Sequence, residues 1–321
     1  MPVGADRKLA ESSSDIIMIV PSERDDVTRK EYLTIQFLQK LSALFSLAGS
    51  LFIVWQVLFN DDNPRNPKIS NIYHRIMLVL SFFDILSSAG LFAGNWAIPE
   101  DTAYDYIQDN FGNTATCDVQ GFAILLGWTG TVTSNSALSL YFLLLVKYNW
   151  SNDTLKKRLE RPFHLVLLLF CLPLATVGLI FNLYNPTITY CFNELYPLDC
   201  NDPAYGNVPC VRGNEEVNKY FRFIVNFILA PVALIVIVVS MVSLYQTVRS
   251  QELRAMEYAS DATLRRLSEQ TRQLYCRAVW YVGSFSVVWI PALINSNVEY
   301  SFALQLVTKF ILPLQGKLFM L

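Results

Sequence analysis

The chain contains seven apolar stretches, each long enough to cross a lipid bilayer as a helix, and this pattern limits its fold more than any other feature. A helix needs about 20 mainly apolar residues to span the hydrocarbon core. Only 16% of the 321 residues are charged, against about 25% in an average soluble domain. The predicted spans are residues 33–59, 72–96, 120–147, 163–184, 220–246, 275–295 and 301–321.

Lipid offers no partner to free backbone N–H and C=O groups, so these spans are predicted to be helical. The sequence therefore predicts an all-α membrane protein, a seven-transmembrane helix bundle over residues 33–321 that follows a polar N-terminal tail at 1–32. The two histidines, His74 and His164, are isolated, and neither a nucleophile triad nor a phosphate-binding glycine loop is present. We therefore expect no enzyme activity, no metal site and no nucleic-acid partner.

The distribution of charge predicts the orientation. Lysine and arginine gather between spans one and two, three and four, and five and six, whereas residues 97–117 hold none and residues 185–218 are mainly acidic. Basic segments stay on the cytoplasmic side, so we expect the N-terminus outside, the C-terminus inside and a place in the plasma membrane. Two glycosylation sequons, at Asn149 and Asn152, lie on the predicted inner side; such short patterns often arise by chance.

Cysteine positions agree with this orientation. Four of the six lie in segments predicted to be extracellular, where disulfides persist, and four cysteines allow three pairings. We favour one bond from the start of helix three to the second outer loop and one within that loop. The favoured pairs are Cys117–Cys191 and Cys200–Cys210, with Cys171 and Cys276 free.

Several short motifs carry a family resemblance. They are Leu80-Ser-Phe-Phe-Asp84-Ile-Leu in helix two, Cys117-Asp-Val-Gln-Gly-Phe122 at the start of helix three, Tyr190-Cys191-Phe192 in the second outer loop, Trp289-Ile-Pro291 in helix six and Pro313-Leu-Gln-Gly316 in helix seven. Together they resemble G-protein-coupled receptors of the cyclic-AMP-receptor-like and secretin/adhesion-like groups. The acidic–Arg–Tyr triplet of rhodopsin-like receptors is missing, and Lys317 and Phe319 depart from the usual residues after the helix-seven motif.

The resemblance implies a receptor in which an extracellular small molecule or peptide moves helix six, so that a heterotrimeric G protein binds inside. The basic inner face would then dock the G protein, and the sequence Arg265-Arg-Leu-Ser268 makes Ser268 a candidate phosphorylation site. The candidate docking residues are Lys147, Arg249, Arg265, Arg266 and Arg272.

Asp84 is a carboxylate deep within the second span. Intramembrane acids need partners and are often functional. One interpretation is a polar switch that binds a sodium ion or a proton, with Ser134, Asn135 and Gln315 at a suitable depth. The other is a static interhelical hydrogen bond.

Lys309 is the second intramembrane charge, and three interpretations are open. It forms the floor of a pocket for an anionic ligand, or a Schiff base with retinal in a photoreceptor or light-driven transporter, or a structural pair with an acid or a carbonyl. A retinal Schiff base needs a counter-ion, and helix three offers only Asp118, at its outer end.

The remaining pocket candidates are two basic and two aromatic residues. Lys219 and Arg222 begin helix five on the outer side and either join Lys309 in a basic pocket or form a solvated rim paired with the acidic loops. Trp128 and Trp289 are aromatic candidates, and a kink at Pro291 would lie beside Trp289. Plain packing is the alternative for Trp289.

Overall fold

The computed structural model describes residues 29–60, 67–102, 107, 109–198, 200–201, 208–258, 283, 287–288, 290–291, 294 and 301–314. These residues are mostly helical, and five of their helices are long and apolar enough to cross a bilayer, as expected of an all-α membrane protein. The first three are α1 (Arg29–Leu58), α2 (Ile72–Ala93, followed by a 3-10 turn at Gly94–Ala97) and α3 (Thr114–Val146). A short 3-10 turn, Lys68–Ser70, precedes α2.

The fourth and fifth long helices are continuous but contain π-helical stretches. The fourth runs through α4 (Asn152–Leu155), a π stretch (Lys156–Glu160), α5 (Arg161–Val166), a second π stretch (Leu167–Cys171) and α6 (Leu172–Ile180). The fifth runs through α7 (Glu215–Phe223), a π stretch (Ile224–Leu229) and α8 (Ala230–Tyr258).

Each of the three π stretches ends two residues before a proline: Pro162, Pro173 or Pro231. A proline inside a helix has no N–H to donate, and its ring clashes with the carbonyl four residues earlier. Widening the preceding turn relieves this clash while the helix continues. The prolines therefore explain where these two helices become irregular.

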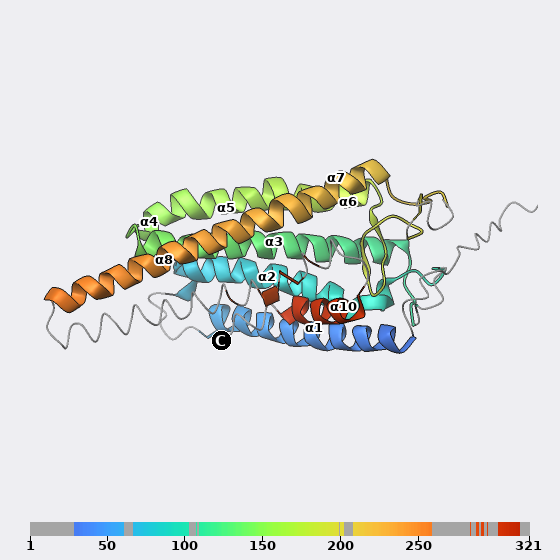
Figure 1. The fold of residues 1–321 in the computed structure, drawn as a ribbon, viewed down its shortest axis with the longest axis horizontal. Coiled ribbons are helices and arrows are strands. Elements are labelled where there is room, and N and C mark those ends of the chain that lie inside the picture. Colours follow the sequence, from blue (N-terminus) through green and yellow to red (C-terminus); the bar gives the residue numbers. More distant parts are fainter. Residues whose placement is uncertain are drawn as a thin grey trace, which may run out of the picture.

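Helix α3 lies at the centre of the bundle, in contact with α2, α6, α8 and the strands (Figure 1). Its first turn is fixed by a capping box in which Asn113 and Thr116 bond each other's backbone N–H. Glycines on its surface allow neighbours to approach closely, as small residues do in membrane helices. Gly127 faces Ser87 of α2, and Gly130 faces the ring of Phe83.

Residues 181–214 form what we call the disulfide-bonded loop. It contains a two-stranded antiparallel sheet, β1 (Tyr184–Pro186) and β2 (Cys191–Asn193), with Asn185 opposite Phe192. The structure forms both favoured disulfides, Cys117–Cys191 with a Cα–Cα distance of 5.2 Å and Cys200–Cys210 with 5.1 Å. Cys171 is free and buried, as predicted, and Cys276 lies outside the described residues.

The fourth helix differs from the predicted span 163–184 at both ends. It begins at Asn152, capped by Ser151, and passes through the basic residues that were expected to form a loop. It ends at Ile180, and Tyr184 belongs to β1. Hydropathy identifies the apolar residues that lie in the bilayer and not the ends of the helix. It therefore does not detect the part of a helix that continues into a basic segment at the membrane surface. The fifth helix likewise extends to Tyr258, beyond the end of the predicted span 220–246.

The last two predicted spans are described only in part. Most of span 275–295 lies outside the described residues. The last span is represented by α10 (Phe302–Ile311) and a 3-10 turn (Leu312–Leu314). Helix α10 lies against α1 (Figure 1).

Candidate functional site

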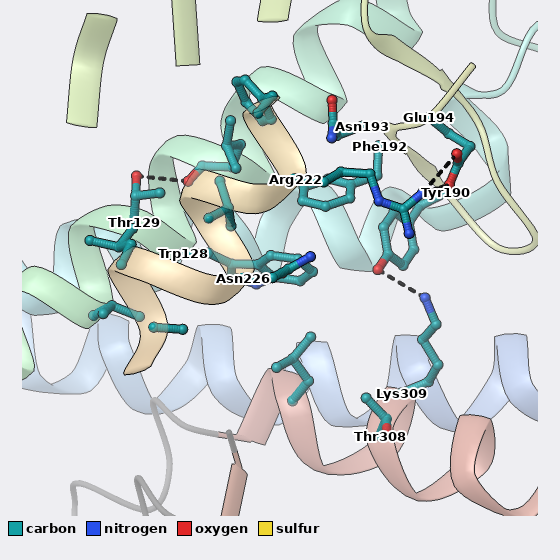
Figure 2. A pocket seen from close by; sticks show the side chains of 17 residues that line it. Trp128, Thr129, Tyr190, Phe192, Asn193, Glu194, Arg222, Asn226, Thr308 and Lys309 are labelled. Atoms are coloured by element: carbon teal, nitrogen blue, oxygen red, sulfur yellow. Dashed lines mark hydrogen bonds and ion pairs between the residues drawn. The ribbon is translucent and has the colours of Figure 1, made fainter. Parts of the chain in front are cut away.

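A cavity of about 200 Å³ lies among α3, β2, the fifth helix and α10 (Figure 2). Helix α3 and the fifth helix form much of its wall, β2 and its neighbours cover it, and α10 adds a charged side chain. The lining residues are Leu125, Trp128, Thr129 and Val132 from α3; Tyr190, Phe192, Asn193 and Glu194 from β2 and its flanks; Phe221, Arg222, Val225, Asn226, Leu229 and Ala230 from the fifth helix; and Thr308, Lys309 and Leu312.

Gln120 and the Cys117–Cys191 disulfide hold β2 over the cavity. The Gln120 amide accepts a hydrogen bond from the Cys191 N–H at 2.7 Å and donates to the carbonyls of Gly90 and Gly94 at 2.8 Å each. One side chain of α3 thus joins the end of α2 to β2. Since Tyr190 and Phe192 flank Cys191, this clamp fixes the two aromatic side chains that line the cavity.

The aromatic wall is a cluster of three rings. Trp128 lies 4.8 Å from Phe192 and 6.5 Å from Tyr190 between centroids, the latter edge to face at 89°. The Tyr190 and Phe192 rings are 6.0 Å apart. Edge-to-face and tilted pairs at these distances are favourable. The predicted pocket residue Trp128 therefore does face the cavity, whereas Trp289 lies outside the described residues.

Lys309 extends from α10 toward the aromatic cluster (Figure 2). Its Nζ donates a hydrogen bond to the Tyr190 hydroxyl at 2.8 Å and lies 4.0 Å from the centroid of that ring. Burial raises the pKa of the Tyr190 phenol above its usual range, so the phenol stays neutral. The ion pairs found among the described residues do not include Lys309.

Of the three cations of the predicted basic pocket, Arg222 and Lys309 line the cavity and Lys219 does not. Arg222 lines the cavity but forms an ion pair with Glu194 at 3.2 Å. Lys219 is exposed and does not line the cavity. Successive residues point about 100° apart around a helix, and Lys219 directly follows the buried Asn218. Arg222 both lines the cavity and pairs with Glu194 of the acidic loop, so a basic pocket for a ligand stays a prediction.

Asp84 is buried between α2 and α3, where it accepts a hydrogen bond from the Thr131 hydroxyl at 2.9 Å. The sequence did not single out Thr131. The buried Ser134 donates its hydroxyl to the carbonyl of Gly130 at 2.7 Å, so this proton is not available to Asp84. Asn135 is also buried on α3, and Gln315 lies outside the described residues. The sodium or proton switch at Asp84 stays a prediction.

The other candidates lie away from the cavity. Asp118 pairs with Arg212 of the disulfide-bonded loop at 2.5 Å. Lys147 caps the opposite end of α3, and Arg249 is exposed on α8. The candidates Arg265, Arg266, Ser268 and Arg272 lie outside the described residues.

Two residues important for the cavity were not chosen from the sequence as site residues. Gln120 and Tyr190 both belong to motifs that were noticed, as members of the Cys117–Phe122 and Tyr190–Phe192 segments. The motifs identify these two positions, and the hydrogen bonds in the structure show what their side chains do. No protein-family model and no curated protein sequence matches this chain.

Proposed function

We propose that this chain is a seven-helix receptor of the plasma membrane, with its N-terminus outside, that binds an extracellular ligand and activates a cytoplasmic heterotrimeric G protein. The observation that carries the proposal is the cavity at the disulfide-bonded end of the bundle. It is lined by α3, the fifth helix and α10 and covered by a strand that a disulfide ties to α3. A ligand there contacts several helices at once, so it can favour one arrangement of the bundle over another.

The opposite end of the bundle offers basic side chains to a partner. Lys147 follows the last residue of α3, about 50 Å along the helix from its first turn, and Arg249 is exposed near the far end of α8. A basic cytoplasmic face suits a G protein. Movement of helix six, carried over from the family resemblance, is the step by which the ligand signal would reach this face.

Nucleotide exchange on co-expressed G proteins tests the proposal. Membranes containing the chain are screened with small acids, nucleotides and peptides, and exchange is followed by binding of a non-hydrolysable GTP analogue. Trp128→Ala removes part of the cavity wall and is expected to raise the half-maximal ligand concentration at least about tenfold, because an aromatic residue at the centre of a binding site contributes about 2 kcal/mol or more, and about 1.4 kcal/mol is a factor of ten. Trp55→Ala is the matched control, since Trp55 is exposed on α1. No exchange with any ligand would contradict the proposal.

Retinal bound to Lys309 is a second candidate, favoured by the position of this lysine against the cavity. The acid that the sequence offered as counter-ion, Asp118, is engaged with Arg212. We therefore expect no visible absorption band when the purified protein is incubated with retinal. A band that disappears in Lys309→Ala would replace the chemical receptor with a photoreceptor or a light-driven transporter.

A further inference from the structure

The charges that face the cavity do not cancel. Arg222 and Glu194 lie 3.2 Å apart and neutralise each other. Lys309 faces the same space, and among the described residues no carboxylate lies within ion-pair distance of it. The described wall therefore carries one uncompensated cation when Lys309 is protonated.

Contacts with the described residues use only part of the bonding capacity of Lys309. An ammonium has three N–H donors, and within the described part of the chain one hydrogen bond leaves it, to the neutral hydroxyl of Tyr190. The Tyr190 ring adds a cation–π contact, which is weaker than an ion pair in a desolvated site. A neutral phenol orients the ammonium but does not neutralise it.

Most of the rest of the described wall is apolar, and Thr129, Asn193, Asn226 and Thr308 are its uncharged polar residues. Leu125, Val132 and Phe221 are buried, and with Trp128 and Phe192 they line the cavity that Lys309 faces. The volume of about 200 Å³ is below the roughly 300–1,000 Å³ of most drug-sized sites. It suits a compact molecule with an apolar or aromatic body.

We propose that the ligand of this cavity is a compact carboxylic acid whose carboxylate binds Lys309 and whose aromatic or apolar body packs against Trp128, Phe192 and Phe221. The inference deepens the proposed receptor function and rests on the same cavity. Lys309 selects for the negative charge of the ligand, and Tyr190 holds the lysine side chain in place. The aromatic cluster selects for the apolar body of the ligand. Arg222 stays paired with Glu194 at the rim.

Matched small molecules test the charge requirement on purified protein. The compounds are 3-phenylpropionate, its neutral amide and the corresponding amine, and the measurement is thermal unfolding followed by tryptophan fluorescence across a concentration series. We expect the acid to raise the unfolding temperature and its apparent affinity to exceed that of the amide by about 10- to 100-fold, the range for hydrogen bonds to a charged group. Lys309→Met should abolish this preference.

Lys219→Met is the matched control, because it removes an exposed lysine that does not line the cavity, and it should keep the full preference. Reductive methylation of the wild-type protein gives a second measurement that needs no variant to fold. The acid should slow modification of Lys309 and leave Lys219 unaffected. Equal stabilisation by acid and amide, a preference that survives Lys309→Met, or no binding of the acid up to its solubility would each overturn the inference.

These measurements need no G protein, so the receptor function and the acid site can each be rejected without rejecting the other. Lys309-dependent binding of the acid without nucleotide exchange would reject the receptor function and leave the acid site standing. Exchange evoked by neutral or cationic ligands alone would keep the receptor and reject the acid.

Discussion

Gln120 is a single residue that connects three parts of the chain. Its buried amide accepts from β2 and donates to two carbonyls where α2 ends. A buried N–H left without a partner costs about 1–3 kcal/mol. Replacing Gln120 by an apolar residue therefore destabilises the protein by more than the loss of its hydrogen bonds, because the Cys191 N–H would stay buried without an acceptor. The position of the aromatic residues over the cavity depends on this amide.

Replacing Gln120 by leucine should lower the free energy of unfolding in detergent by about 2–4 kcal/mol, because the Cys191 N–H loses its acceptor. Gln56→Leu is the control, since Gln56 is exposed on α1 and its replacement should change stability by less than about 0.5 kcal/mol. Equal effects of the two substitutions would show that the amide does not stabilise the loop.

The bond between Asp84 and Thr131 predicts a pairwise coupling. A double-mutant cycle with Asp84→Ala and Thr131→Val should give a coupling energy of about 1 kcal/mol, typical of interhelical hydrogen bonds in membranes. The same cycle with Ser134→Ala in place of Thr131→Val should give a value near zero, because the Ser134 hydroxyl bonds the Gly130 carbonyl. A larger coupling to Ser134 than to Thr131 would contradict this arrangement.

At the scale of elements, α3 and the disulfide-bonded loop meet at a glycine. The Tyr184 ring is fully buried against Gly121 and Gly178, and its hydroxyl donates to the Ala175 carbonyl at 2.7 Å. A Cβ added to Gly121 would lie 2.5 Å from Cγ of Tyr184. Strand β1 can lie this close to α3 only because the residue has no side chain.

Gly121→Ala should therefore destabilise the protein by about 1–3 kcal/mol, the usual cost of overpacking, and should weaken ligand binding by displacing the sheet. Gly283→Ala is the matched control, since an added Cβ there meets nothing within 4 Å. Thermal unfolding of both variants checks the difference. If Gly121→Ala is as stable as Gly283→Ala, the contact with Tyr184 does not limit the packing.

The sequence predicted the long helices and the disulfides better than it predicted which side chains contact one another. Hydropathy located the five long helices that the structure describes, and the cysteine positions led to both disulfides. It missed the early start of the fourth helix at Asn152 and the strands of the loop. Hydropathy measures how long a segment stays apolar, and a helix that leaves the bilayer, or a three-residue strand, does not change that measure.

Partners within the site were harder to predict because they depend on how each helix is rotated and on how far it is shifted along its axis. Ser134 and Asn135 were proposed as partners of Asp84 from their depth alone, and the structure adds Thr131, which lies one turn earlier on the same face of α3. Lys219 and Arg222 look equivalent in sequence, but only Arg222 turns toward the cavity. Small shifts in rotation decide such contacts, and apolar patterning specifies rotation only coarsely.

At the scale of the whole molecule, the predicted orientation can be tested along one helix. Lys219 and Arg249 are exposed residues of the continuous helix through α7 and α8, about 45 Å apart. A membrane-impermeant maleimide should label Lys219→Cys on intact cells, whereas Arg249→Cys should react only after permeabilisation. Unsubstituted protein gives the background from native cysteines, and the reverse pattern would invert the proposed topology.

The wide turns before Pro162, Pro173 and Pro231 determine where chain length can change inside a membrane helix. A π turn closes over five residues and an α turn over four, so each stretch holds a surplus residue. Deleting Pro231 removes one residue, which compensates for the extra residue of the π stretch, and it also removes the proline ring that clashes with the preceding turn. The side chains of α8 should therefore keep their orientation relative to those of α7. A one-residue deletion in the middle of α3 would instead rotate every following side chain by about 100°. Insertions and deletions should therefore be tolerated at these prolines and not in α3.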